Sequence, residues 1–342
     1  MKSSPKPQNR SRPTKLSRII SRDQSNLRLD DFLAVWLPEA LGSAVSRATV
    51  RKLIAGGAVY VSSRRMTQPA YLVREGSRVE AFVDVGRLKP DSLQKDRPFA
   101  FAASRILFED EGLIAVDKPP GLPTQPTLDP LRPHLFGLLQ EFMRNRDGAQ
   151  AYVGLHHRLD RDTSGVVLFT KRTEANAGVA TLFTQHLAQK TYWALALVEK
   201  GSPLRQKKAG DEWVIQNLLG KDPRVSTGKK SRYASVKTGG DFAHTDFKIL
   251  ECWGDLALVE ARPKTGRTHQ IRVHLSEQGA PILGDDTYGV DAPAPSFEVP
   301  RLLLHAACLK FPHPISKVET SISSPIPEDF QKCLNQFRVN QK

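Results

Sequence analysis

The chain has 342 residues, of which 39% are hydrophobic and 25% charged, which excludes a wholly disordered protein and predicts one large or two unequal domains. The formal net charge of +14 favours a polyanionic partner, because each phosphate that Lys or Arg neutralises releases condensed counterions; a basic surface without such a partner is the alternative. No run of about 18 apolar residues is present, so the sequence predicts no membrane span and no membrane partner.

The N-terminal stretch, residues 1–26, is expected to be a basic disordered tail. Its first 22 residues are rich in Lys, Arg, Ser and Pro and contain no acid. An organelle transit peptide has a similar composition, but Pro5, Pro7 and Pro13 disfavour the amphipathic helix of such a peptide. The composition therefore favours an arm that lies on nucleic acid.

Residues 27–85 are expected to form a compact module. An apolar helical stripe begins at Leu29, and a second helix begins near Ser46, a plausible N-cap. The glycine pair at 56–57 ends that helix, and residues 58–62 alternate as a strand. The module is therefore predicted to combine two helices with a strand.

The second helix of the module also has a basic face, made of Arg47, Arg51 and Lys52. Two further arginines follow in the next turn, at positions 64 and 65. These residues predict a cationic platform for phosphates. A solvated charged face would show the same pattern.

The order of these elements resembles the small RNA-binding module of the S-four type, which is named after a small-subunit ribosomal protein. The resemblance is carried by residues 28–33, 46–61 and 73–79 and covers about sixty residues. It implies that an RNA-binding module precedes the rest of the chain.

Residues 86–103 are expected to be a linker, and residues 104–335 a larger domain. Its predicted strands cover residues 114–118, 166–170, 192–198, 245–251 and 256–261. Its predicted helices cover residues 173–189 and 268–278, whereas residues 205–232 are basic, lack apolar periodicity and are expected to be an insertion or long loop. This irregular order predicts an α+β fold with a mixed, largely antiparallel central sheet.

The segment 154–165 concentrates polar residues beside an apolar strand, which requires either hydrogen-bond partners or a function. In a purely structural interpretation, Asp160 and Asp162 pair with neighbouring arginines to fix a turn. The glycine spacing fits no phosphate-binding loop, and Ser164 lacks the Gly-x-Ser-x-Gly pattern of a serine hydrolase. The residues alone leave the structural and the catalytic interpretation open.

A second polar cluster covers residues 263–275. Its predicted helix begins near Thr268 and would place His269, Arg272 and Ser276 on one face, where an arginine can hold a buried carboxylate. A basic surface helix is the alternative. His269 and His274 have no third ligand nearby, so no metal site is expected.

Five motifs in order resemble those of the RluA-type pseudouridine synthases. They are Asp117-Lys-Pro-Pro-Gly, His157-Arg-Leu-Asp-x-x-Thr-Ser-Gly, Lys190-Thr-Tyr-Trp-Ala, Thr265-Gly-Arg-Thr-His-Gln-Ile-Arg-Val-His and Arg301-Leu-Leu-Leu-His-Ala. The resemblance spans about residues 114–313 and implies a cofactor-free isomerisation of uridine within RNA. The RNA-binding module stands where the family would place it, ahead of this domain.

The resemblance also implies roles for individual residues. Asp160 matches the catalytic aspartate, Arg272 the basic residue that pairs with it, and Tyr192 the aromatic residue that stacks on the target base. Leu304 matches an apolar pocket residue. The residues assigned to substrate binding are Leu304, Arg158, Arg267, His269 and, in the N-terminal module, Arg47, Arg51 and Lys52. Asp162 and Ser164 are expected to stabilise the turn.

Three questions of function remain open at this level. Asp160 could attack the ribose, add to the base or remove a ribose proton. A non-catalytic RNA-binding protein and a nucleoside glycosidase are the alternatives to an isomerase. The intact set of Asp160, Tyr192 and Arg272 disfavours the first of these, and release of free uracil would identify the second.

The partner is expected to be structured RNA, with ribosomal RNA favoured over transfer RNA. The three cysteines, at 252, 308 and 333, are widely separated and fit a reducing compartment. With no secretory signal recognised, a cytoplasmic location is expected. A monomer is expected, because no coiled-coil pattern or repeat suggests assembly.

Overall fold

The computed structural model describes residues 14–43, 45–83, 101–127, 132–224, 232–289 and 298–339. The chain separates into two compact units, Met1–Ala100 with Gln125–Leu138 and Phe101–Thr124 with Leu139–Lys342. Residues 1–13 of the expected tail and residues 86–100 of the expected linker lie outside the described residues. Within the described ranges, no helix is long and apolar enough to cross a membrane.

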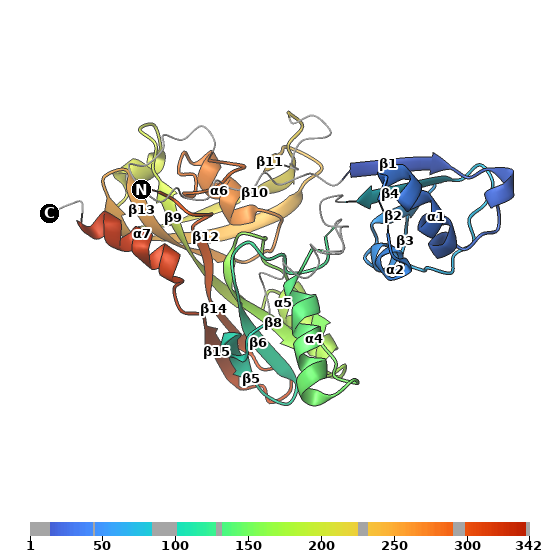
Figure 1. Ribbon diagram of the computed structural model, residues 1–342. Coiled ribbons are helices and arrows are strands. Elements are labelled where there is room, and N and C mark those ends of the chain that lie inside the picture. Colours follow the sequence, from blue (N-terminus) through green and yellow to red (C-terminus); the bar gives the residue numbers. More distant parts are fainter. Residues whose placement is uncertain are drawn as a thin grey trace, which may run out of the picture. The chain divides into compact units, whose positions relative to one another are not determined.

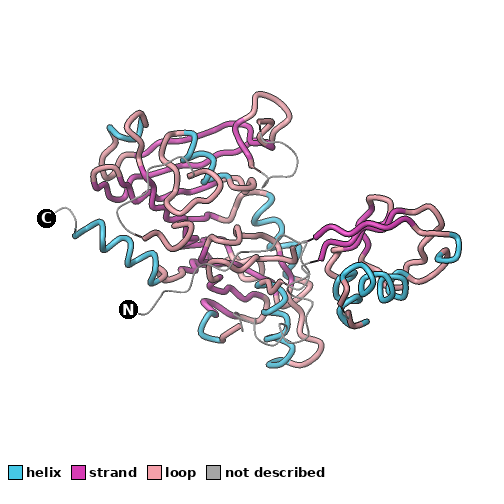
Figure 2. The backbone as a smooth tube through the Cα atoms, turned by 45° about the horizontal axis from the view of Figure 1, so that its top comes forward, coloured by secondary structure: helices cyan, strands magenta, loops and turns pink. Residues whose placement is uncertain are grey.

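The first unit contains a four-stranded antiparallel sheet in the order β1-β4-β2-β3, drawn in blue in Figure 1. Its elements are β1 (Thr14–Ile19), a 3₁₀ helix (Arg22–Gln24), α1 (Leu29–Leu41), α2 (Arg47–Ala55), β2 (Val59–Val61), β3 (Arg64–Met66) and β4 (Arg78–Val83). Both α-helices lie on the same side of the sheet (Figure 2). Their apolar faces and the strands enclose one core.

The predicted second helix is confirmed in detail. Ser46 caps α2, since its Oγ accepts a hydrogen bond from the Thr49 backbone N–H at 3.1 Å. Val50, Leu53 and Ile54 are buried in the core of the unit. The hydroxyl satisfies one of the backbone donors that the start of a helix leaves unpaired, and the apolar stripe fixes which face turns inward.

The expectation of a disordered tail is wrong for residues 14–26. Thr14–Ile19 form β1, which pairs with β4 along all six of its residues. Leu16 packs against the core of the unit, and Ile20 is buried in it, while Ser17 and Ile19 alternate with them and are exposed. A strand this short, flanked by basic residues, is stabilised by its sheet partner rather than by its own composition.

The second unit is built on a mixed eleven-stranded sheet in the order β11-β10-β12-β13-β9-β14-β8-β6-β5, with β15 beside β14 and β7 beside β8 (Figure 1). Its strands are β5 (Ile106–Glu109), β6 (Leu113–Lys118), β7 (Gly154–Leu155), β8 (Ser164–Thr170), β9 (Gln189–Leu197), β10 (Glu212–Lys221), β11 (Tyr233–Ser235), β12 (Asp241–Trp253), β13 (Leu256–Pro263), β14 (Leu304–Pro312) and β15 (Glu319–Ser323). The helices from residue 135 onward are α4 (Leu135–Asp147), α5 (Ala175–Thr184), α6 (Gln270–Glu277) and α7 (Glu328–Val339).

One strand pair in this sheet is parallel, and it adjoins the polar loop 154–165. β8 and β14 run parallel, with Ser164 opposite His305 and Gly165 opposite Ala306, whereas the other paired strands of the described sheet are antiparallel. Gly165 has a φ of +116°, and a Cβ there would lie 2.2 Å from the Ala306 carbonyl oxygen. Only glycine fits this crossing, which carries the end of the loop to β14. The predicted α+β fold with a mixed, largely antiparallel sheet is confirmed.

Two expectations about this unit need correction. The segment 205–232, expected to be an insertion or long loop, contains the ten-residue strand β10, which pairs with β12 and β11. Trp213 and Ile215 pack against the core from β10, so a half-buried alternation is present that the basic flanks obscured. The helix expected over 173–189 ends at Thr184, because His186 adopts a φ of +57° and the chain enters β9 at Gln189.

Candidate active site

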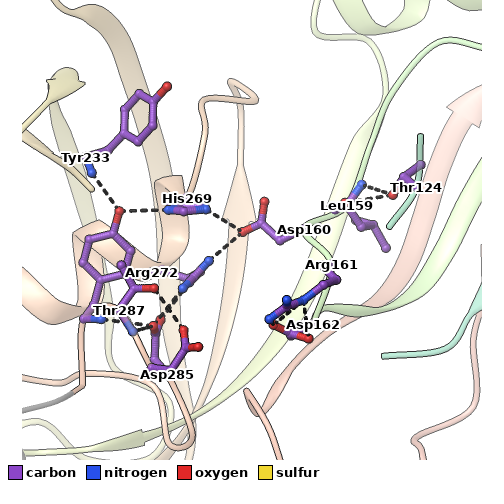
Figure 3. A network of polar contacts seen from close by, with 12 residues as sticks. Thr124, Leu159, Asp160, Arg161, Asp162, Tyr233, His269, Arg272, Asp285 and Thr287 are labelled. Carbon is purple, nitrogen blue, oxygen red and sulfur yellow. Dashed lines mark hydrogen bonds and ion pairs between the residues drawn. The ribbon is translucent and has the colours of Figure 1, made fainter. Parts of the chain in front are cut away.

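The loop that carries Asp160 joins β7 to β8 and is held on both sides of that residue. Thr124 Oγ1 accepts a hydrogen bond from the Leu159 N–H at 3.1 Å and donates one to the Leu159 carbonyl at 2.8 Å (Figure 3). On the other side, Lys118 Nζ donates to the Arg161 carbonyl at 2.8 Å. The backbone of the loop is therefore fixed by side chains from neighbouring segments, which limits where the Asp160 carboxylate can lie.

Lys118 is fully buried at the end of β6. Its Nζ also donates to the Pro119 and Leu122 carbonyls, at 3.0 and 2.7 Å. Burial lowers the pKa of Lys118 to about 7, and the carboxylates of Asp162 and Asp160 oppose that shift. We assign the ammonium form, because three carbonyl acceptors match its three N–H donors, whereas a neutral amine would leave one carbonyl unpaired.

The Asp160 carboxylate forms an ion pair with Arg272, whose NH1 donates to Asp160 Oδ2 at 3.2 Å. The same guanidinium donates from Nε and NH2 to the two oxygens of Asp285, at 2.7 and 2.8 Å. Asp285 is fully buried, and the side chain of Arg272 is 8% exposed. The bidentate pair with Asp285 fixes the plane of the guanidinium and leaves NH1 directed at Asp160.

One guanidinium thus serves two carboxylates inside the protein. Burial on its own would lower the pKa of Arg272, but the hydrogen bonds and charges of Asp285 and Asp160 raise that pKa above its ordinary value. Asp285 Oδ1 also accepts backbone N–H donors from Thr287 and Tyr288, at 2.9 and 3.0 Å. Because these extra donors share the charge of Asp285, Arg272 can stabilise the charge of Asp160 as well.

His269 faces the same oxygen of the Asp160 carboxylate as Arg272 does (Figure 3). Its Nε2 is 3.8 Å from Asp160 Oδ2, and its Nδ1 is 2.9 Å from the Tyr288 hydroxyl. That hydroxyl accepts the Tyr233 N–H at 2.9 Å, so its own proton is free to go to Nδ1. We therefore assign the neutral tautomer with the proton on Nε2, facing the carboxylate. Burial lowers the pKa of His269, which agrees with a neutral ring.

The expected helical position of His269 is wrong. α6 begins at Gln270, and His269 precedes it with a φ of +58°, in the left-handed region. The imidazole still reaches Asp160 together with Arg272, but it does so from the turn before the helix.

An open pocket with about 480 Å³ of space lies in front of the carboxylate. Its lining residues are Arg158, Leu159, Asp160, Thr163, Lys190, Tyr192, Pro263, Thr265, Gly266, Arg267, His269, Gln270, Ile271, Arg272 and Leu304. Tyr192 on β9 and Leu304 at the start of β14 come from adjacent strands. Burial, with the charge of Asp160, raises the pKa of Tyr192 above its ordinary value, so the phenol is neutral.

Seven of the expected site residues therefore line one pocket: Asp160, Arg272, Tyr192, Leu304, Arg158, Arg267 and His269. The two residues that were expected to stabilise the turn make local contacts. Asp162 accepts from Arg161 Nε at 3.0 Å, and Ser164 Oγ lies 3.0 Å from Nδ1 of the buried His305. Neither is among the lining residues of the pocket.

The remaining expected residues belong to α2 in the other unit. Arg47 NH1 donates to Asp31 at 2.7 Å, and Arg51 Nε donates to Asp30 at 3.1 Å. Lys52 is exposed. The basic face of α2 is therefore partly neutralised by acids of α1, which the helical pattern of α2 by itself does not reveal.

The sequence assigned no role to Lys118, Lys190, Asp285 or Tyr288, although the first two stand in quoted motifs. The signal for Asp285 was chemical, since a buried arginine with a single acid leaves donors unpaired. No group of three or more His, Cys, Asp or Glu side chains that could hold a metal ion occurs among the described residues.

Comparisons with known proteins agree with both units. Residues 112–277 match the family model described as RNA pseudouridylate synthase, and residues 27–79 match the S4 domain. The chain is 32% identical to ribosomal large subunit pseudouridine synthase C of Yersinia pestis over 94% of this chain and 95% of that protein. It is 30% identical to the protein of the same name from Escherichia coli (strain K12), over 93% of this chain and 95% of that protein.

A solved structure shares the fold. Human RNA Pseudouridylate Synthase Domain Containing 4 superposes with a TM-score of 0.54 and 26% identity, over 69% of this chain and 93% of that one. The similarity thus extends from the order of the motifs to the arrangement of the strands that carry them.

Proposed function

Since the chain belongs to the pseudouridine synthase family, of the RluA type, we propose that it isomerises uridine in ribosomal RNA of the large subunit, with Asp160 as the reacting carboxylate. The enzyme is an isomerase that acts on RNA. The relatives named above, which match over nearly their whole length, support the choice of ribosomal RNA. We also propose that the protein acts as a monomer, because its sequence contains no coiled-coil pattern or repeat that suggests assembly.

The observation that carries the proposal is the placement of Asp160. Its carboxylate lies in an open pocket, where Arg272 and His269 both face its Oδ2, and Tyr192 lines the same pocket. Arg272 is oriented by Asp285 and cannot rotate away without breaking two hydrogen bonds. An ionised, oriented carboxylate beside an aromatic ring meets the two needs of the reaction, a reactive anion and a surface for the base.

In the reaction, the C1′–N1 bond of uridine breaks and a C1′–C5 bond forms. The C5 proton is lost and N1 gains a proton, so no oxidant or cofactor enters the balance. The base must first leave its stack, at a cost of a few kcal/mol. Tyr192 offsets part of this cost by stacking on the uracil, by about 1–3 kcal/mol. Leu304 closes the apolar side of the pocket and helps to exclude water while the uracil is detached.

The other cations of the second unit are assigned to RNA. Arg158 is exposed at the rim of the pocket, and no hydrogen bond of its side chain to another described residue is found, so it is available to the substrate. Arg267 is also exposed and lines the pocket. In the first unit, Arg47, Arg51 and Lys52 are proposed to contact phosphates from α2.

The test is an Asp160→Asn variant assayed on unmodified large-subunit ribosomal RNA transcribed in vitro. We expect pseudouridine formation to be abolished while RNA affinity stays within about twofold, because the substitution keeps the shape and removes the charge. Full turnover by the variant would refute the assignment of Asp160. Release of free uracil by the wild-type enzyme, without pseudouridine, would instead identify a glycosidase.

The target RNA is tested separately. Mapping of pseudouridines in cells with and without the protein should show the loss of specific positions in large-subunit ribosomal RNA. Loss confined to transfer RNA would overturn the proposed substrate but leave the role of Asp160 standing.

A further inference from the structure

Lys190 lines the pocket but has no part in the Asp160 network. It lies on β9 two residues before Tyr192, and therefore on the same face of the sheet. Its Nζ donates to the Thr265 carbonyl oxygen at 3.0 Å, its only hydrogen bond to the described residues. An ammonium has three N–H donors, so two are left for a ligand in the pocket.

The charge of Lys190 is not compensated by an acid. Among the residues that the structure describes, Asp160 is the only acidic one that lines the pocket, and Arg272 holds its carboxylate. Burial, and then the positive charge of Arg267, lowers the pKa of Lys190 to about 8. Arg267 donates from Nε to the Phe242 carbonyl at 2.8 Å, and no ion pair of its guanidinium with a described acid is found. Lys190 and Arg267 are therefore two neighbouring cations that face the pocket, and neither forms an ion pair with a described acid.

Gly266 directly precedes Arg267 in the chain and leaves space next to the Lys190 side chain. A Cβ at this position would meet only the Lys190 Nζ, at 3.8 Å, which is an ordinary contact. Gly266 is exposed and does not have a positive φ. Neither backbone strain nor packing within the protein requires glycine here. We therefore attribute the glycine to the close approach of a ligand.

We propose that Lys190, Gly266 and Arg267 form a subsite for a backbone phosphate of the RNA next to the flipped uridine. This inference rests on the proposed function and adds a subsite to it. A phosphate supplies the missing negative charge and several acceptor oxygens, which suits two adjacent cations better than a neutral carbonyl of uracil does. Lys190 is about 7 Å along the strand from Tyr192, so a base stacked on the tyrosine leaves room for its sugar in between.

The first test compares Lys190→Met with Lys190→Arg and Gly266→Ala on large-subunit ribosomal RNA transcribed in vitro. Lys190→Met should lower kcat/KM by about 10- to 100-fold, the range of one charge-assisted hydrogen bond, mainly through KM. The dependence of RNA affinity on salt concentration should become shallower in this variant, by the slope expected for about one phosphate contact. Lys190→Arg should restore most of the loss. Gly266→Ala should raise KM without lowering the melting temperature, because the methyl group occupies space that only the substrate uses.

The matched control is Lys310→Met, which also removes one positive charge from the sheet. Lys310 pairs with Glu319 and does not line the pocket. Equal effects of Lys190→Met and Lys310→Met on KM would overturn the subsite. A wild-type enzyme that forms no pseudouridine would overturn the proposed function instead, so the two failures are distinguishable.

The second test addresses the phosphate directly. RNA substrates with a neutral methylphosphonate at either linkage of the target uridine should lose kcat/KM with the wild-type enzyme at one of the two positions. With Lys190→Met the loss at that position should be smaller, because only Arg267 is left to contact the phosphate. Equal losses in both enzymes at both positions would contradict a phosphate contact, as would a Lys190→Met defect confined to kcat. The KM of the wild-type enzyme should also rise above pH 8, as Lys190 loses its proton, and the KM of Lys190→Arg should not.

Discussion

Each of the two units pairs an arginine of a helix with a buried aspartate, but in opposite surroundings. In α2, Arg51 donates to Asp30, whose side chain is 4% exposed, while Arg51 itself is 59% exposed. In α6, Arg272 donates to the fully buried Asp285 and is itself 8% exposed. The first guanidinium is mostly hydrated and screened by salt, whereas the second has lost its water and depends on its carboxylates.

This difference separates two uses of the same ion pair. A hydrated arginine can exchange an aspartate for an RNA phosphate at little cost. Water replaces the contact that the guanidinium loses, and the buried Asp30 stays paired because Arg28 donates to both of its oxygens. A buried arginine cannot, since any change leaves a charge without a partner in the interior. The α2 pairs therefore suit a reversible contact with RNA, and the Arg272 pairs suit a site that must keep one geometry through the reaction.

The largest effect is expected where the buried pair is broken. Arg272→Met should slow pseudouridine formation by about 1000-fold, because the Asp160 carboxylate loses the cation that orients it. It should also lower the free energy of unfolding by about 3–5 kcal/mol, since Asp285 is left buried and unpaired. Single-turnover rates and urea denaturation measure the two effects. Arg272→Lys should recover little of either, because an ammonium cannot hold Asp285 by two parallel bonds and also reach Asp160.

Arg301→Met is the control for the loss of a mostly buried arginine. Arg301 is 9% exposed, pairs with Asp329 and does not line the pocket. We expect this variant to lose stability while its rate stays within about tenfold of wild type. If Arg272→Met were no slower than Arg301→Met, the catalytic effect would be only a consequence of weaker folding.

The next effect should distinguish the two units by how strongly the stability of each depends on pH. Eight of the nine histidines lie in the second unit, and the ninth, His134, lies in the segment 125–138 of the first. The first 100 residues, which include Trp36, contain none. Burial, and then the charge of His244, lowers the pKa of the buried His274 to about 4. Asn217 Oδ1 lies 3.0 Å from its Nε2 and Thr245 Oγ1 lies 3.0 Å from its Nδ1, which suits the neutral ring.

The sign of the effect follows from the lowered pKa. Between about pH 6.5 and pH 4, His274 is protonated in the unfolded chain but stays neutral in the folded chain. The free energy of unfolding therefore falls as the pH is lowered through this range, by up to about 3 kcal/mol from this residue. The indole resonance of Trp213 should report unfolding of the second unit at a lower urea concentration at pH 4.5 than at pH 7. That of Trp36 should move far less, and equal shifts in both would contradict the assignment to histidine.

Much of this architecture could be predicted from local signals. The cap of α2 at Ser46, the strands β6, β8, β9, β12 and β13, and the cluster around Asp160 could each be recognised within about ten residues of sequence. Ordered motifs then selected Asp160, Tyr192 and Arg272 from many polar residues, and the structure places all three at one pocket.

The contacts that were missed all join distant or atypical segments. β1 is defined by its pairing with β4, more than sixty residues later, and β10 by its pairing with β12. The bidentate partner of Arg272 is Asp285, which lies in a loop where no periodicity applies. Likewise, nothing local to α2 reveals that acids of α1 hold two of its arginines.

The smallest effect is expected for the hydrated basic residues of α2. Lys52→Met should weaken RNA binding about fivefold at 0.15 M salt, as expected for one phosphate contact, and leave the rate at saturating RNA unchanged. Arg47→Met should cost less, because Asp31 already holds that guanidinium at 2.7 Å. Asp31→Asn should release it and strengthen binding by up to about fivefold. RNA affinity measured over a range of salt concentrations distinguishes these outcomes. If Arg47→Met cost as much as Lys52→Met, the acids of α1 would not be competing with phosphate, and hydration would not make the α2 pairs exchangeable.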